Sequence, residues 1–162
     1  MWQAFFTATN LIAVAGWAGL LLLPRKPVPL TLVFYLGAGL LCACYALILA
    51  LLVTGAVDPA PVAGGAPADL ANYSIAGIRA LFQSDGGIVL GWTHYLAFDL
   101  FTGLWIARDA DAKGFGRLIQ APFLLATFLV GPAGLLGWLI MREKRARQAA
   151  RASGEGLSGL RR

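Results

Sequence analysis

Four apolar runs separated by polar breaks dominate the pattern of this chain. They cover residues 2–23, 30–53, 87–107 and 118–141. A helix of about 20 residues spans roughly 30 Å, which is the thickness of the hydrocarbon core of a bilayer. The pattern therefore predicts an all-α membrane protein, with a bundle of four transmembrane helices in residues 1–141.

The breaks between the runs differ in length and character. Residues 24–29, PRKPVP, contain three prolines that end one helix and precede the next. Residues 54–86 form the longest break, and their first half is rich in Pro, Gly and Ala and should be irregular. In its second half, residues 70–82 are weakly amphipathic and too short to span, which fits either a short interfacial or re-entrant helix or a plain surface loop. A short polar turn follows at 108–117.

The last apolar run contains the sequence Gly131-Pro132-Ala133-Gly134. Proline inside a spanning helix removes one backbone hydrogen bond, so we expect one kinked helix over 118–141 with carbonyls freed into the bundle. The basic residues 142–162 should form a frayed helix at the headgroups and then a disordered tail.

Composition supports a membrane location and one bundle without a separate soluble domain. Hydrophobic residues make up 59% of the chain and charged residues 13%, with a mean hydropathy of +0.72. Soluble domains carry about 25% charged residues. The net charge of +5 comes largely from the basic tail, which indicates contact with membrane lipids and not with nucleic acid.

In a four-span topology, the distribution of basic residues does not determine the orientation in the membrane. Four spans place both termini on one side. Five basic residues then lie in the breaks at one face, and six lie at the other face. These two sets are Arg25, Lys26, Arg108, Lys113 and Arg117, against Arg79, Arg142, Lys144, Arg145, Arg147 and Arg151. The positive-inside rule requires a clear asymmetry, and this count is close to a tie.

Candidate chemistry is concentrated in residues 87–107, GIVLGWTHYLAFDLFTGLWIA. This run holds His94, which is the only histidine of the chain, and Asp99, both near the middle of a predicted span. An aspartate at the bilayer centre costs about 2.5–3.5 kcal/mol on insertion. Ionisable groups at such depth usually face the bundle interior and mark a functional site.

An α-helix rotates by 100° per residue, and this repeat predicts two stripes of side chains on the helix. His94 and Asp99 are about 140° apart and do not form a pair on one face. The polar stripe consists of Tyr95, Asp99 and Thr102, and the aromatic stripe of His94, Phe98, Phe101 and Trp105. Together they would suit a long apolar ligand whose polar end lies near a carboxyl group. A metal site is the poorer interpretation, because one histidine without a second ligand-rich helix cannot build a di-metal cage.

The segment Trp92–Trp105, WTHYLAFDLFTGLW, resembles the signature of the abscisic acid-deficient-4-like membrane family. The resemblance continues in the polar turn 108–116, in Pro122 and Thr127, and in GPAGLL at 131–136. Plant members of that family are needed to make neoxanthin. No transit peptide precedes the first run, and the chain is rich in Ala and Arg, so we expect a multi-pass protein of a bacterial inner membrane.

The resemblance implies a carotenoid or a related isoprenoid as the substrate. The expected step is an isomerase-type opening of an epoxide to an allenic alcohol, without a cofactor. Within the membrane, Asp99 would be the acid and neutral His94 the base. A non-catalytic carotenoid-binding or assembly subunit is the alternative, and a small proton-coupled transporter is a third class. Glycine-rich faces of the first two runs could also serve a homodimer.

Overall fold

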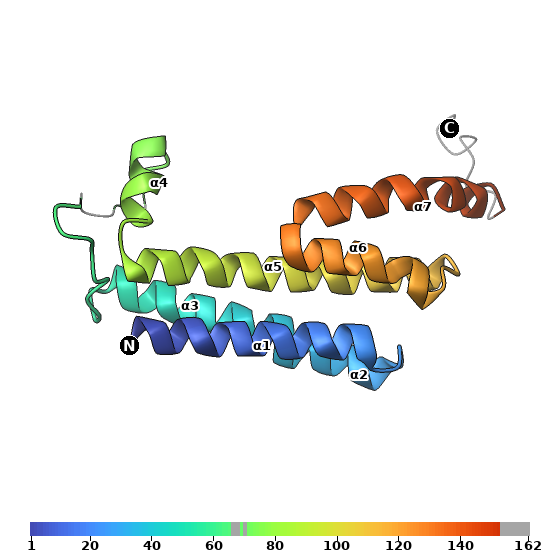
Figure 1. The fold of residues 1–162 in the computed structure, drawn as a ribbon, viewed down its shortest axis with the longest axis horizontal. Coiled ribbons are helices and arrows are strands. Elements are labelled where there is room, and N and C mark those ends of the chain that lie inside the picture. The colour runs from blue at the N-terminus through green and yellow to red at the C-terminus, as the bar shows by residue number, and fades with distance from the viewer. Residues whose placement is uncertain (66–68, 70, 153–162) are drawn as a thin grey trace, which may run out of the picture. The chain divides into compact units, whose positions relative to one another are not determined.

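The computed structural model describes residues 1–65, 69 and 71–152 (Figure 1). Its regular elements are helices, accompanied by an isolated bridge between Pro61 and Ser84, so the all-α prediction is confirmed. In chain order the helices are α1 (Trp2–Leu22), α2 (Pro27–Leu32), the π-helix η1 (Val33–Gly39), α3 (Leu40–Val53), α4 (Ile75–Leu81), α5 (Asp85–Ala112), α6 (Arg117–Val130) and α7 (Pro132–Ala152).

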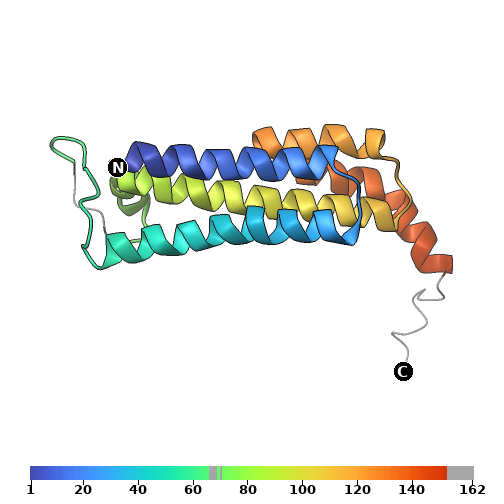
Figure 2. The same ribbon diagram turned by 90° about the horizontal axis from the view of Figure 1, so that it is seen from below.

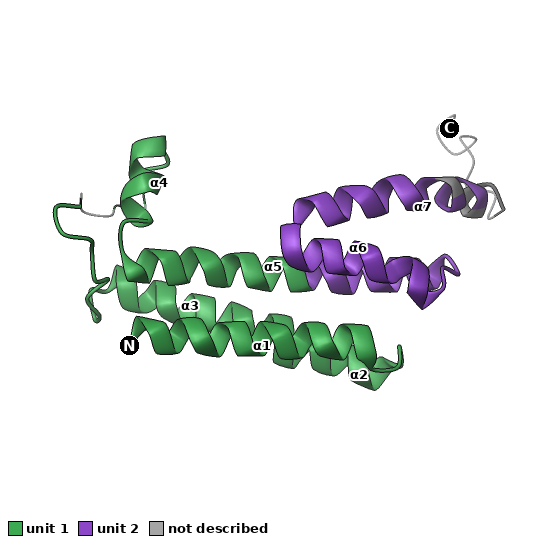
Figure 3. Ribbon diagram, in the orientation of Figure 1, with its two compact units in different colours: residues 1–100 green, residues 101–162 purple. Residues whose placement is uncertain are grey.

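Two compact units divide the chain, one formed by Met1–Leu100 and the other by Phe101–Arg162 (Figure 3). In the first unit α1, the α2–η1–α3 helix and the beginning of α5 lie side by side (Figures 1 and 2). A core cluster of Trp2, Ile48, Val89 and Leu90 ties one end of the three helices together. α1 and α5 run parallel, because Trp2 packs near Val89 whereas Gly16 lies against Leu100.

Small residues allow the first two long helices to approach closely. A Cβ atom added at Gly16 would lie 3.6 Å from the Cα of Gly37 and would collide with the Leu100 side chain. The absence of side chains at these glycines therefore lets the two helices approach closely. At η1 the Leu40 N–H reaches the carbonyl of Tyr35, five residues earlier, so the turn widens without interrupting the helix.

The long break folds back over the end of this unit. The indole Nε1–H of Trp2 donates to the carbonyl of Asp58 at 3.0 Å, and the Val62 N–H donates to the carbonyl of Gln83 at 2.8 Å. The weak amphipathic pattern at 70–82 corresponds to α4, which is shorter than the pattern and begins at the Ser74 cap. Leu70 lies outside the described residues.

The second unit overturns the prediction of one kinked span over 118–141. α6 ends at Gly131, whose φ of 44° and ψ of −103° favour glycine, and α7 starts at Pro132. α7 then packs back along α6, with Gly134 against Thr127 and the rings of Trp138 and Phe123 5.6 Å apart. The chain reverses at Gly131 instead of bending, because the glycine–proline pair ends α6 and the packing of Gly134 and Trp138 holds α7 against it.

Two helices of the described residues are long and apolar enough to cross a membrane, namely α1 and the continuous helix Pro27–Val53. α5 contains the third apolar run, 87–107, but it is not one of these two helices. α6, with 14 residues, is only about 21 Å long, too short to cross alone, so a fourth span is not shown. α7 continues through the basic residues to Ala152, and the disorder predicted for the end of the chain falls on residues 153–162, outside the described part.

Candidate functional site

A cavity of about 630 Å³ lies in the first unit between α3, α4 and α5. Its walls are mostly apolar. The residues that line it are Tyr45, Leu49, Asp69, Asn72, Tyr73, Gly77, Ile78, Leu81, Phe82, Leu90, Gly91 and His94. Concave sites of this size with a few polar groups are typical of small-molecule binding. The single histidine of the chain therefore lines a ligand-sized cavity.

The His94 ring is held between two aromatic rings in this cavity wall. Its centroid lies 5.5 Å from that of Tyr45 on α3 and 4.7 Å from that of Phe98, one turn later on α5. Both neighbours restrict the orientation of the imidazole, while the ring itself stays exposed. Tyr45 lines the same cavity, so a residue with a proton-accepting nitrogen and a residue with a hydroxyl group are neighbours in its wall.

A glycine shapes the cavity beside His94. Gly91 precedes His94 by about one turn, and a Cβ atom there would come within 2.7 Å of the Phe82 ring. Phe82 follows the end of α4, so its ring closes the cavity only because position 91 carries no side chain. Gly91 thus leaves open space one turn away from the His94 imidazole on the same helix.

Polar groups form the rim at the α4 side. The Asn72 side-chain oxygen accepts from the Ser74 hydroxyl at 2.7 Å and from the Ser74 N–H at 3.1 Å. The Ser74 hydroxyl in turn accepts from the Gly77 N–H at 3.1 Å and caps α4. Tyr73 and Asp69 complete the rim, and Tyr73 is exposed. The cavity is therefore an apolar space with carboxylate, amide and phenol groups at its edge.

Asp99 lies on a different face of α5 from His94, as the helical spacing predicts. It is 9% exposed, and its Oδ2 is buried without a hydrogen-bond partner among the described residues. The hydroxyl of Tyr95, one turn earlier, interacts with this carboxylate. Asp99 is thus part of a polar stripe, but it is not among the residues that line the cavity at His94.

The aromatic stripe is divided between the two units. Phe98 contacts His94 in the first unit, whereas Phe101 and Trp105 follow in the second, as does Thr102 of the polar stripe. Phe98, Phe101 and Trp105 are all exposed, and Thr102 is half-buried. The guanidinium of Arg142 lies 5.4 Å from the centre of the Trp105 ring. Among these predicted binding residues, Phe98 lies against His94 within the first unit.

Comparison with models of known protein families shows to which family this chain belongs. The model of the ABA DEFICIENT 4-like family matches residues 4–138, which include the cavity, Asp99 and the α6–α7 turn. The chain belongs to the ABA4-like family. Comparisons with curated proteins and with solved structures give no match. The resemblance seen in Trp92–Trp105 is thus confirmed, and it places the chain in a membrane-associated family.

Sequence reasoning on this ABA4-like protein missed most of the residues that surround His94. Tyr45 is not among the site residues that the sequence predicts, and Asn72, Tyr73 and Phe82 fall in a break that the sequence leaves open as a short helix or a surface loop. Two signals were available. Tyr45 is a hydroxyl-bearing residue inside an apolar run, and Gly91 lies about one turn before the only histidine. Their pairing depends on how α3 and α4 pack on α5, which spacing along one helix does not determine.

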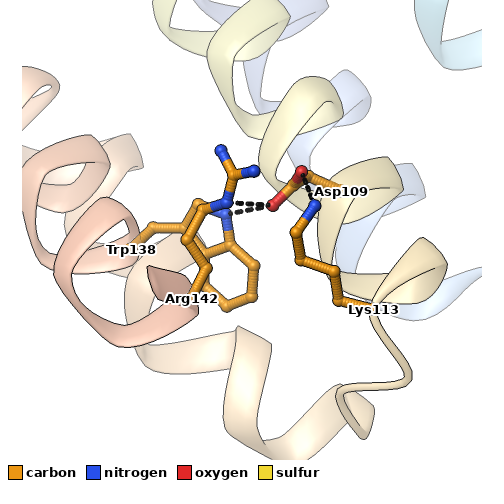
Figure 4. A network of polar contacts seen from close by, with 4 residues as sticks. All are labelled: Asp109, Lys113, Trp138 and Arg142. Carbon is orange, nitrogen blue, oxygen red and sulfur yellow. Dashed lines mark hydrogen bonds and ion pairs between the residues drawn. The ribbon is translucent and has the colours of Figure 1, made fainter. Parts of the chain in front are cut away.

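A second polar cluster of the ABA4-like chain lies in the second unit and has a structural role (Figure 4). The Oδ1 atom of Asp109 pairs with the Lys113 ammonium at 2.6 Å. Its Oδ2 atom accepts a hydrogen bond from the Trp138 indole at 3.0 Å and forms an ion pair with the Arg142 Nε, also at 3.0 Å. Both carboxylate oxygens are used, so this aspartate fastens α7 to the end of α5. Among the described residues no three His, Cys, Asp or Glu side chains converge to hold a metal ion.

Proposed function

We propose that this protein binds one end ring of a carotenoid or a related isoprenoid in the cavity at His94 and catalyses an isomerase-type step there. The observation that carries the proposal is the shared wall of His94 and Tyr45, whose rings lie 5.5 Å apart. A full-length carotenoid is longer than this cavity, so its polyene chain would extend into the surrounding lipid. The polar rim is suited to a hydroxylated ring.

The reaction we infer is the opening of an epoxide next to the polyene. A base removes a proton from the polyene carbon beside the epoxide, and the C–H electron pair forms the new double bond of the allene. The C–O bond breaks, and an acid protonates the oxygen to give the alcohol. The product is an isomer of the substrate, so no oxidant or reductant is consumed. Proton exchange afterwards restores both groups.

His94 is the base in this proposal because it is the imidazole that lines the cavity. Two groups are candidates for the acid. The sequence favours Asp99, whereas the cavity favours Tyr45, because Tyr45 lines it together with His94 and Asp99 does not. We propose Tyr45 as the acid on this ground, and Asp99→Asn is the variant that separates the two.

The test is pigment analysis of a host that makes an epoxycarotenoid and expresses the full chain. The wild type should convert the pigment, and His94→Gln and Tyr45→Phe should each reduce conversion about 10²-fold or more. Tyr35→Phe is the matched control, because Tyr35 is an exposed tyrosine of the same Pro27–Val53 helix. Conversion unaffected by His94→Gln would disprove the base role.

The polar rim also favours a second candidate, a non-catalytic carotenoid-binding subunit. Asp69, Asn72 and Tyr73 could anchor a hydroxylated ring without any reaction. A binder should copurify with unchanged carotenoid in stoichiometric amounts, and the host chromatogram should stay the same. An enzyme should change the chromatogram, and His94→Gln should then retain pigment that it no longer converts.

A further inference from the structure

The α6–α7 hairpin is apolar everywhere except at its open end. Residues 118–141 carry no charged side chain, while Arg117 precedes them and Arg142 follows them. Next to the turn, Val130 is exposed and Leu129 is 70% exposed. Exposed apolar side chains of this kind are unfavourable in water and favourable in a hydrocarbon environment. The closed end of the hairpin thus has the surface of a membrane-embedded element.

The backbone of the turn is suited to the same environment. A non-helical turn within a membrane needs its polar groups satisfied internally. The Gly131 N–H donates to the carbonyl of Thr127 at 2.9 Å, and Pro132 has no N–H. The carbonyl of Gly131 accepts from the N–H groups of Gly134 at 3.1 Å and Leu135 at 3.3 Å. At residues 131 and 132 the backbone N–H groups are therefore paired or absent, and the carbonyl of Gly131 is paired.

A hairpin that enters and leaves on one side changes the count of membrane crossings. α1, the Pro27–Val53 helix and α5 then cross, whereas α6 and α7 return to the side at which α5 ends. Of the eleven basic residues that a four-span topology divides five to six, ten now lie at one face of the membrane. Arg79, in α4, is alone at the other. Such an asymmetry predicts that the ten lie at the cytoplasmic face.

The open end of the hairpin presents charge suited to anionic headgroups. Residues 108–152 include eight basic and three acidic residues. The three acidic side chains are engaged, Asp109 by Lys113 and Arg142, Asp111 by Gln120, and Glu143 by Arg147. Arg108 and Arg147 are exposed. Basic residues beside a membrane attract the anionic lipids of the cytoplasmic leaflet.

We propose that the α6–α7 hairpin is a re-entrant element in a three-span topology and that the basic residues at its open end bind anionic phospholipid headgroups of the cytoplasmic leaflet. The hairpin enters the bilayer from that leaflet with Gly131 and Pro132 at its deepest point. At its open end the hairpin is held to α5 by the contacts of Trp138 and Arg142 with Asp109.

Topology is tested with single cysteines in the full chain, in a background with Cys42→Ala and Cys44→Ala. Val62→Cys, Ala112→Cys and Gln148→Cys each replace an exposed residue and are labelled in intact cells with an impermeant maleimide. We expect labelling at 62 from outside, and at 112 and 148 only after permeabilisation. Labelling of 148 together with 62 would overturn the re-entrant hairpin, and labelling of 112 and 148 from outside would overturn the orientation.

Lipid binding is tested by purifying the chain from bilayers that contain phosphatidylglycerol and phosphatidylcholine and measuring retained lipid by native mass spectrometry. Arg108→Gln combined with Arg147→Gln should lower phosphatidylglycerol binding roughly tenfold or more. Arg79→Gln is the control at the opposite end and should have no such effect. Equal retention by the double variant and the wild type, or an equal loss in Arg79→Gln, would overturn the headgroup assignment.

Discussion

The rings of His94 and Tyr45 lie 5.5 Å apart, although the two residues belong to different helices and to distant parts of the chain. Their proximity arises because α3 and α5 pack together around the cluster of Trp2, Ile48, Val89 and Leu90. α4 then covers the space beside them. This relationship makes the cavity, and not the polar stripe of one helix, the place where chemistry can be tested.

The identity of the acid is tested by Asp99→Asn, compared with Tyr45→Phe. If Tyr45 protonates the epoxide oxygen, Asp99→Asn should retain most of the conversion, while Tyr45→Phe should lose about 10²-fold or more. The measurement is the product-to-substrate ratio at equal protein levels in the membrane. Loss of conversion in Asp99→Asn alone would return the acid role to Asp99.

Cavity occupancy is tested by Gly91→Leu. A side chain at position 91 must displace the Phe82 ring and fill space next to His94. We expect copurified carotenoid to fall about tenfold or more, because a filled pocket excludes its ligand. Ala46→Leu adds the same side chain at an exposed position of α3 and should leave binding unchanged. Wild-type pigment content in Gly91→Leu would place the ligand elsewhere.

The Asp109 cluster should contribute to the stability of the second unit. Asp109→Asn removes the charge that pairs with Lys113 and Arg142 while their side chains stay mostly buried, so unfolding should become easier by about 2 kcal/mol. Glu143→Gln breaks an exposed pair with Arg147 and should cost about 0.5 kcal/mol or less. Thermal unfolding in detergent compares the two. Equal effects would mean that the cluster adds no more than a surface pair.

Close packing within the hairpin is tested by Gly134→Ala. The added Cβ atom would overlap the backbone of Thr127, so α6 and α7 must move apart, at a cost of about 1–3 kcal/mol. Gly116→Ala is the control, because a Cβ atom there meets nothing within 4 Å. The readout is again the thermal midpoint. A destabilisation in Gly116→Ala that matches Gly134→Ala would show that the effect is not due to helix contact.

The sequence by itself determined the helical class, the first two long helices and the position of a backbone irregularity at Gly131-Pro132, which it predicted as a kink. These features depend on local properties, namely the length of apolar runs and the backbone preferences of glycine and proline. The signature around His94 also determined the family, since a motif of that kind is read directly from residue types. The angle between His94 and Asp99 followed from the helical repeat alone.

Only the tertiary structure decided how these elements meet. A glycine–proline pair permits either a kink or a full reversal, and the fit of Gly134 on Thr127 and of Trp138 on Phe123 selected the reversal. Tyr45 and Phe82 reach His94 through packing between helices, which the period of a single helix cannot reveal. Local preference sets what a segment can form. Contacts between distant residues decide which of those forms is adopted and which side chains share a site.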